Sequence, residues 1–282
     1  MIDDIYNLYL KCFTDYRCDR VCFDELLEPE QAVIFTECAE DSLAAFVIVW
    51  GGSITLICVD IPHRNKGIGS RLLKKAEEHI KKTGADKIIL GHGSHYLLQG
   101  VPTVDEKTVP FFQKHGYRAA WTSANMILPL SHYAPDSINI PALPPDISFR
   151  FAVDSDKEAL LLAVDDAEPG WHGVFETCTD PVLLAVDSRT NQIIGFEILS
   201  KDGGRFLKGA GCIGCVGVIQ SARDKGIGRR MVAKGIEWLK SKGSPYVELR
   251  YVELVDWYKV LGFQVIGWQW MGEKTLMSEG TE

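Results

Sequence analysis

The chain contains an internal repeat, and this repeat limits the folds that are open to it. The segment RNKGIG at 64–69 recurs as RDKGIG at 223–228, displaced by 159 residues. The likeness continues without a gap through Leu90 and Leu249, and eleven of these 27 aligned positions are identical. Such a repeat predicts two units of one kind. With 282 residues, the chain has room for two units of roughly 130–150 residues, each able to bury its own core.

Both copies occur in the same order of predicted elements. An apolar strand precedes each copy, at 54–61 and at 212–219, and a helix with apolar residues at helical spacing follows. A short strand, a short helix with a glycine–aromatic pair and a final strand complete each half. The segment between the halves is rich in proline and lacks periodicity. We therefore predict an N-terminal domain over 1–130, a linker over 131–145 and a C-terminal domain over 146–282.

The repeated loop has the composition of an anion-binding site. Its glycines allow the backbone to turn tightly and to approach a ligand closely. The helix that follows begins with unpaired N–H groups and a partial positive charge, which suit a phosphate. The loop lacks the Gly-Lys-Ser/Thr ending of a P-loop and the three-glycine pattern of a dinucleotide site. A plain helix start with turn glycines is the alternative for one copy, but two copies in the same context weigh against it.

Composition and charge exclude several other classes of protein. The formal net charge is −8 and no basic run is present, so we expect no nucleic-acid partner. No apolar run reaches about 18 residues, so we expect no membrane span. The acidic N-terminus argues against a secretory signal and favours a cytoplasmic location. The eight cysteines include only one C-x-x-C pair, Cys212 and Cys215, so we expect no metal and no disulfide framework.

The two halves resemble the GNAT superfamily of acetyl-CoA-dependent N-acetyltransferases. The resemblance rests on CVDIPHRNKGIG at 58–69, VGVIQSARDKGIG at 216–228 and YKVLGF at 258–263. The stretches QGVP at 99–102 and VELVDWY at 252–258 resemble a bacterial group with two such domains in tandem. The resemblance implies an α/β (α+β) fold. Each domain would have a mixed, mostly antiparallel sheet that is flanked by helices and has a splayed central strand pair.

The resemblance also implies where the cofactor binds. In this superfamily the diphosphate of CoA lies on the glycine loop, and the pantetheine arm runs between the two splayed strands. The cofactor site implied for the second half contains Val216, Val218, Arg223, Lys225, Gly226, Ile227, Gly228 and Arg229. The equivalent residues of the first half are Arg64, Lys66, Gly67, Gly69 and Ser70. Acetyl-CoA is therefore the expected cosubstrate, without a metal.

A catalytic tyrosine is expected in only one half. In the superfamily a tyrosine before the Gly–Phe pair commonly protonates the departing thiolate, and Tyr258 has this position. The first half has Phe112 at the matching position, and phenylalanine cannot donate a proton. The alternative role for Tyr258 is packing of its ring between helix and sheet. We predict catalysis in the C-terminal half.

The general base is predicted among nearby carboxylates, which members of the superfamily often use through a water. The candidates are Glu197, Glu248, Glu253 and Asp256. We choose Glu253, because it opens the stretch that leads to Tyr258. Tyr251 stands where the usual pattern has an asparagine, so substrate contacts do not carry over. The first half has a 13-residue insertion, where His92 and His95 could act as bases near neutral pH or be ordinary loop residues.

The predicted activity is acetyl transfer from acetyl-CoA to a primary amine of a small molecule or peptide. Direct attack in a ternary complex is expected, because no Cys or Ser lies in a recognisable nucleophile setting. The alternative is a non-catalytic CoA- or acyl-CoA-binding sensor or scaffold, which Phe112 favours for the first half. A longer acyl donor or a hydroxyl acceptor stays open. The two domains could pack as a monomeric pseudo-dimer, or the chain could form a homodimer.

Overall fold

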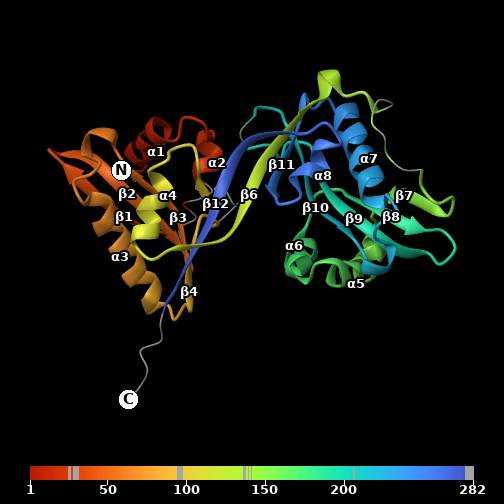
Figure 1. Cartoon of the computed structure of the whole chain (residues 1–282), viewed down its shortest axis with the longest axis horizontal. Coiled ribbons are helices and arrows are strands. Elements are labelled where there is room, and N and C mark those ends of the chain that lie inside the picture. The colour runs from red at the N-terminus through yellow and green to blue at the C-terminus, as the bar shows by residue number, and fades with distance from the viewer. Residues whose placement is uncertain are drawn as a thin grey trace, which may run out of the picture. The chain divides into compact units, whose positions relative to one another are not determined.

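The computed structural model describes residues 1–24, 27, 32–93, 98–135, 138, 140, 142–205 and 207–276. Contacts between Cα atoms divide the chain into two compact units (Figure 1). The first unit contains residues 1–124 and the described part of 267–282, and the second contains residues 125–266. Each unit has strands and covering helices of its own, as the repeat predicts, and the strands of both units belong to one hydrogen-bonded sheet.

The first unit has helices on both faces of its sheet. Its strands are β1 (Ala32–Ala39), β2 (Ser42–Trp50), β3 (Ser53–Val59), β4 (Lys87–Leu90), β5 (Val101–Pro102) and most of β12 (Gln264–Thr275). Its helices are α1 (Ile2–Cys12), α2 (Arg20–Asp24), α3 (Ile68–Lys82) and α4 (Thr108–Lys114). The strand order is β1-β2-β3-β4-β12, with β5 paired to β12. Residues 44–49 of β2 are all buried, so both faces of this strand are covered, and α1 and α3 contact it.

The second unit repeats this arrangement. Its strands are β7 (Ile147–Phe151), β8 (Val182–Asp187), β9 (Gln192–Ser200), β10 (Gly211–Val218) and β11 (Tyr246–Val252). Its helices are α5 (Lys157–Ala167), α6 (His172–Thr177), α7 (Ile227–Ser241) and α8 (Val255–Lys259). The strand order is β11-β10-β9-β8-β7, and β6 (Arg118–Pro129) lies next to β11. Figure 1 shows α7 on one side of this sheet and α5 and α6 on the other.

The helix after each glycine loop uses the apolar face that the sequence predicts. In α3 the buried residues are Ile68, Leu72, Leu73, Ala76 and Ile80, and they belong to the core of the first unit. In α7 the buried residues include Ile227, Met231, Val232, Gly235 and Leu239, at the equivalent positions. Each helix ends just before a glycine with positive φ, Gly84 or Gly243, as expected for a helix C-terminus.

The central parallel strand pair of each unit separates after two residue pairs. Strands β3 and β4 pair at Ser53↔Ile89 and Ile54↔Leu90, and β10 and β11 pair at Gly211↔Val247 and Cys212↔Glu248. Both β3 and β10 continue beyond these pairs, to Val59 and Val218. The strand pairs β1–β2, β2–β3, β4–β12, β5–β12, β7–β8, β8–β9 and β9–β10 are antiparallel. The predicted fold class, with two tandem domains and a splayed central pair in each, is confirmed.

The boundary between the two units lies within β6 and within β12. Residues 267–275 of β12 belong to the first unit, where Glu273, Lys274 and Thr275 pair with β4. In Figure 1 the blue β12 accordingly lies beside the orange β4. The backbone groups at this edge of β4 need hydrogen-bond partners, and β12 supplies them. The second compact unit thus ends at residue 266, whereas the predicted C-terminal domain extends to residue 282. The domain boundaries stay a prediction.

The predicted linker over 131–145 belongs to the second unit, where α7 anchors two of its described residues. Arg230 Nη2 donates to Ile140 O at 2.8 Å, and Lys240 Nζ donates to Tyr133 O at 3.3 Å, so both anchors come from α7.

Within the described ranges, no helix is long and apolar enough to cross a membrane. The same residues contain no group of three His, Cys, Asp or Glu side chains that could hold a metal ion.

Candidate functional site

The two glycine loops have nearly the same backbone geometry. Each follows a splayed strand, passes through a short 3-10 turn (Ile61–His63 or Gln220–Ala222) and enters a helix. Gly67 and Gly226 have φ values of 77° and 75°, in the left-handed region. Glycine adopts this conformation without the steric cost that a Cβ brings. The repeat in the sequence therefore corresponds to a repeat in backbone conformation.

The helices that follow leave backbone donors free for a ligand. The first helical hydrogen bonds run from Arg71 N to Gly67 O at 3.1 Å and from Arg230 N to Gly226 O at 3.2 Å. The N–H groups of 68–70 and 227–229 precede these bonds, and a glycine N-cap has no side chain to accept from them. This arrangement suits the binding of a phosphate.

One arginine in each loop fixes the turn to the end of the splayed strand. Arg64 Nε donates to Val59 O at 3.0 Å, and Arg223 Nε donates to Val218 O at 3.1 Å. Arg223 Nη2 also donates to Ala167 O at 3.1 Å, which ties the loop to the end of α5. Both arginines are exposed. Their backbone bonds hold two positive charges in place beside the loops.

The second glycine of each loop lies against an aromatic ring. A Cβ on Gly69 would lie 3.4 Å from the ring of Phe111, and a Cβ on Gly228 would lie 3.3 Å from the ring of Trp257. These aromatic residues belong to α4 and α8, the short helices before the glycine–aromatic pairs. In the second unit, the Arg229 guanidinium also lies 5.8 Å from the centroid of the Trp257 ring. The glycine loop and the short helix before the glycine–aromatic pair are thus neighbours in both units.

The remaining predicted cofactor residues lie on the same loops and strands. Lys66 and Lys225 are exposed, and Lys225 Nζ donates to Ser221 O at 3.0 Å. Ser70 is half-buried in the first turn of α3. The Ile227 side chain is buried in the core, so only its backbone could face a ligand. Val216 and Val218 are half-buried, beyond the last pair between β10 and β11. Their roles toward a cofactor stay predictions.

Tyr258 lies on α8 and packs edge-on against two aromatic rings. The ring centroids lie 4.6 Å from Trp257 and 5.9 Å from Phe263. Burial raises the pKa of the Tyr258 phenol, and the charges of Glu197 and Cys215 add to the effect. The phenol is therefore protonated at neutral pH, as a proton donor must be. In the first unit Phe112 has the same position, is buried, and packs edge-on against Tyr117 at 5.7 Å.

The four candidate bases lie in different environments. Glu248 is buried and accepts hydrogen bonds from Arg205 N at 2.8 Å and Leu207 N at 2.9 Å, which makes it a support for that loop. Asp256 is exposed and pairs with Lys259 Nζ at 2.9 Å. Glu253 is exposed, just after β11. Its role as the base stays a prediction.

Glu197 is fully buried on β9, opposite the irregular part of β10. Among the described residues neither carboxyl oxygen has a hydrogen-bond partner, and burial raises the pKa of this carboxyl well above its usual value. Burial without a hydrogen-bond partner thus disfavours the ionised carboxylate, which is the form that a general base needs.

The sequence reasoning missed a bulge in each central strand. In β10 the register shifts between Gly214 and Gly217, and Cys215 has a positive φ of 49°. In β3 the register shifts beside Thr55, because Leu56 pairs with Ile48 and Ile54 pairs with Val49. A bulge bends its strand and re-aims the nearby side chains. The two glycines around Cys215 were the only signal of this feature in the sequence.

The histidine-containing insertion of the first half packs against the bulge of β3. A Cβ on Gly93 would lie 2.5 Å from Thr55 Oγ1, so this loop approaches the strand very closely. His92 is half-buried, its N–H donates to Leu98 O at 2.8 Å, and burial and Lys87 lower the pKa of its imidazole. The ring is therefore neutral at pH 7. His95 lies outside the described residues.

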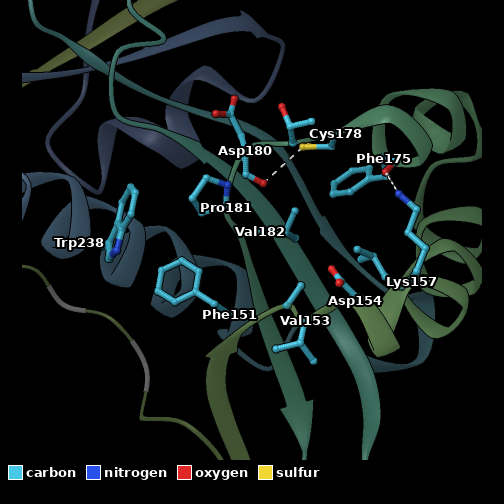
Figure 2. A pocket seen from close by; sticks show the side chains of 13 residues that line it. Phe151, Val153, Asp154, Lys157, Phe175, Cys178, Asp180, Pro181, Val182 and Trp238 are labelled. Atoms are coloured by element: carbon cyan, nitrogen blue, oxygen red, sulfur yellow. Dashed lines mark hydrogen bonds between the residues drawn. The ribbon is translucent and has the colours of Figure 1, made fainter.

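A surface hollow of about 840 Å³ in the second unit lies away from the predicted site (Figure 2). It is lined by Phe151, Phe175, Pro181 and Trp238, among others. Because β8 and β10 are both antiparallel to β9, the start of β8 and the glycine loop lie at opposite ends of the sheet. Lys157, on its wall, donates to Phe175 O at 2.8 Å. The hollow contains none of the predicted site residues.

Comparisons with known proteins agree with the repeated geometry. A family model described as Acetyltransferase (GNAT) family matches the chain twice, at residues 2–117 and 152–263. A mycothiol acetyltransferase of Renibacterium salmoninarum is 29% identical over 237 residues. That match covers 75% of this chain but 64% of the relative, so the chain spans less than two thirds of that protein.

Solved structures with the same fold cover nearly the whole chain. A GCN5-related glucosamine N-acetyltransferase region of a fungal multi-domain GH3 β-N-acetylglucosaminidase has a TM-score of 0.86 at 24% identity, covering 96% of this chain and 36% of that one. A GCN5-related N-acetyltransferase from Sphaerobacter thermophilus has a TM-score of 0.76 at 20% identity, covering 96% and 91%. A tandem GNAT protein from the clavulanic acid biosynthesis pathway has a TM-score of 0.70 at 15% identity, covering 98% and 96%.

Proposed function

We propose, from the premise that this chain belongs to the acetyltransferase (GNAT) family, that it transfers an acetyl group from acetyl-CoA to a primary amine. The acceptor is a small molecule or a peptide. The observation that carries the proposal is the second-unit loop, where left-handed Gly226, free N–H groups and Arg223 lie at the end of a splayed strand. The name of the mycothiol acetyltransferase relative supports a small-molecule acceptor.

The residues of the second unit divide the chemistry among them. The N–H groups of 227–229, with Arg223 and Lys225, hold the diphosphate of the cosubstrate. The backbone of Val216 and Val218 binds its pantetheine arm along the splayed strand. Glu253 takes the amine proton through a water, and the Tyr258 phenol gives a proton to the departing thiolate. The attack is direct, so no side chain of the chain becomes acylated.

A second candidate function is binding of CoA or acyl-CoA without transfer. Phe112 favours it for the first unit, because this unit has the loop geometry but no phenol at the matching position. The two functions then coexist in one chain, with turnover in the second unit alone. A cytoplasmic location, and a monomeric or homodimeric state, complete the proposal.

Calorimetric titration of acetyl-CoA tests the cofactor site. Gly226→Trp places an indole at a left-handed residue in the loop, and Gly67→Trp is the matched control in the other unit. We expect binding to the second unit to weaken by roughly tenfold or more, about 1.4 kcal/mol, only in Gly226→Trp. If thermal unfolding shows that Gly226→Trp is destabilised, Arg223→Ala, which keeps the glycine, replaces it in the titration. Loss of binding only in Gly67→Trp would move the working site to the first unit.

A further inference from the structure

Two cysteine thiols of the first unit lie together between a helix and a splayed strand. Cys12 ends α1, and Cys58 is the penultimate residue of β3. Cys12 Sγ lies 3.7 Å from Val59 O, and Cys58 Sγ lies 3.8 Å from Leu8 O. Each Sγ thus contacts the backbone of the element that carries the other cysteine, which brings the two thiols side by side. Cys12 is half-buried, whereas Cys58 is 3% exposed.

A cation lies beside this pair. Arg64 Nε donates to Val59 O at 3.0 Å, the same carbonyl that lies next to Cys12 Sγ. The hydrogen bond from Cys58 and the positive charge of Arg64 lower the pKa of the Cys12 thiol to about 7, against the opposing effects of burial and Asp60. The Asp60 carboxylate is itself paired with Lys11 Nζ at 2.7 Å, which offsets its charge.

The two thiols differ in protonation at neutral pH. The hydrogen bond to Cys12 and burial raise the pKa of the Cys58 thiol. Cys58 therefore keeps its proton and donates to Leu8 O, whereas a larger share of Cys12 than of an ordinary cysteine is thiolate at neutral pH. A thiolate with a neighbouring thiol is the arrangement in which a reactive cysteine has a resolving partner.

We propose that Cys12 and Cys58 are a peroxide-reactive thiol pair that closes to a disulfide. The Cys12 thiolate attacks one oxygen of a hydroperoxide and becomes a sulfenic acid, and the other oxygen leaves as hydroxide or alkoxide and takes a proton from water. The Cys58 thiol then attacks the sulfenic sulfur, forms the S–S bond and releases water. Two thiols are oxidised and one peroxide is reduced, so atoms and electrons balance.

A second thiol pair of the first unit, Cys18 and Cys22, lies beside the Asp19 carboxylate. The hydrogen bond with Cys22 and burial raise the pKa of the Cys18 thiol, and the charge of Asp19 adds to the effect. In the second unit Gly217 stands at the position equivalent to Cys58, so the pair has no counterpart there. Within the repeat, the Cys12–Cys58 pair therefore belongs to the first unit alone.

The location gives the reaction a consequence that rests on the proposed function. Arg64 is part of the predicted cofactor site of the first half and donates to Val59 O at the end of β3, and a disulfide would tie α1 to that strand. Oxidation then changes acetyl-CoA binding to the first unit and leaves the second unit unchanged. The chemistry of the thiols does not depend on this consequence, so the two are tested separately.

The test is peptide mapping of the reduced full-length protein after treatment with hydrogen peroxide. We expect a Cys12–Cys58 disulfide, formed at a rate that rises with pH with a midpoint near pH 7. In Cys58→Ser we expect no such disulfide and a sulfenic acid at Cys12 that dimedone traps. In Arg64→Gln we expect the rate at pH 7 to fall by up to about tenfold, because the thiolate fraction drops toward that of an ordinary cysteine.

The exposed thiol Cys38 is the internal standard. Oxidation of Cys38 before Cys12 would overturn the proposal, and so would oxidation of Cys12 without linkage to Cys58. A Cys12–Cys58 disulfide in a protein that binds no acetyl-CoA would keep the thiol proposal and reject the proposed function. A pH-independent rate in the wild type would reject the role of the Cys12 thiolate.

Discussion

The two halves of this chain share a glycine loop but differ at the centre of the sheet beneath the following helix. The strand registers place Ala45 opposite Val59 and Gly195 opposite Val218, at the ends of the two splayed strands. Two residues farther along, the first half has Val47 and the second half has Glu197. The helix above carries Ala76 in the first half and Gly235 in the second, at positions related by the repeat.

This difference concentrates costly polar groups in one half. Val47 and Ala76 are fully buried in an ordinary apolar core. Glu197 is fully buried too, and a Cβ on Gly235 would lie only 2.4 Å from its Oε1, so the glycine makes room for the carboxyl. A buried polar group without a partner costs stability. Such costs are characteristic of functional sites, and this one lies in the half that also contains Tyr258.

The largest test of the comparison is removal of the strand that the first unit takes from the C-terminal end of the chain. Truncation after Ile266 removes the pairing of β12 with β4 and the ion pairs Lys87–Glu273 and Lys274–Glu77, at 2.8 and 2.9 Å. It also removes the buried Trp270, whose loss alone costs roughly 3–5 kcal/mol. We expect the first unit to unfold while the second keeps its structure.

Limited proteolysis with mass spectrometry measures this outcome unit by unit. Cleavage is expected within 1–124 and protection within most of 125–266. Truncation after Leu276, which keeps every residue of β12, is the control and should leave both units protected. If the first unit resists proteolysis equally after both truncations, β12 is not needed for its stability, and the halves are more independent than the contacts indicate.

The next largest effect concerns the aromatic position before the Gly–aromatic pair. Tyr258→Phe removes the proposed proton donor and leaves the ring packing against Trp257 and Phe263 in place. We expect kcat for acetyl transfer to fall by roughly 10²–10⁴-fold with little change in acetyl-CoA affinity. The measurement is steady-state release of CoA, and the matched change is Phe112→Tyr. Equal turnover in wild type and Tyr258→Phe would leave Tyr258 with a packing role only.

Much of the fold could be predicted from the sequence, because repeated glycines and helical periodicity act locally. The glycine loops, the helices that follow them and the short strand Lys87–Leu90 lie where the spacing placed them. The pairing of β12 with β4 of the first unit could not be predicted, since strand pairing between residues so far apart in the sequence leaves no local pattern. The burial of Glu197 was equally hidden. The alternation of residues along a strand is the same whether a single carboxylate faces solvent or a covering helix.

The smallest predicted effect transfers the apolar pair of the first half to the second. The double change Glu197→Val and Gly235→Ala recreates Val47 and Ala76, and it removes a buried carboxyl without a partner. We expect the second unit to gain roughly 1–3 kcal/mol at neutral pH, measured by thermal unfolding. Gly235→Ala alone should destabilise it, because the new methyl group meets Oε1 of Glu197.

The pH dependence decides whether the carboxyl is the cause. The folded protein raises the pKa of Glu197 above its unfolded value of about 4.3, so proton uptake by this group favours the folded state. This contribution to stability is present in full below about pH 4.3. That contribution is lost as pH rises toward the folded pKa. The advantage of the double variant should therefore be small near pH 4 and grow from there to neutral pH. A constant advantage would assign the gain to packing and helix propensity, and would place the cost of the second half somewhere other than Glu197.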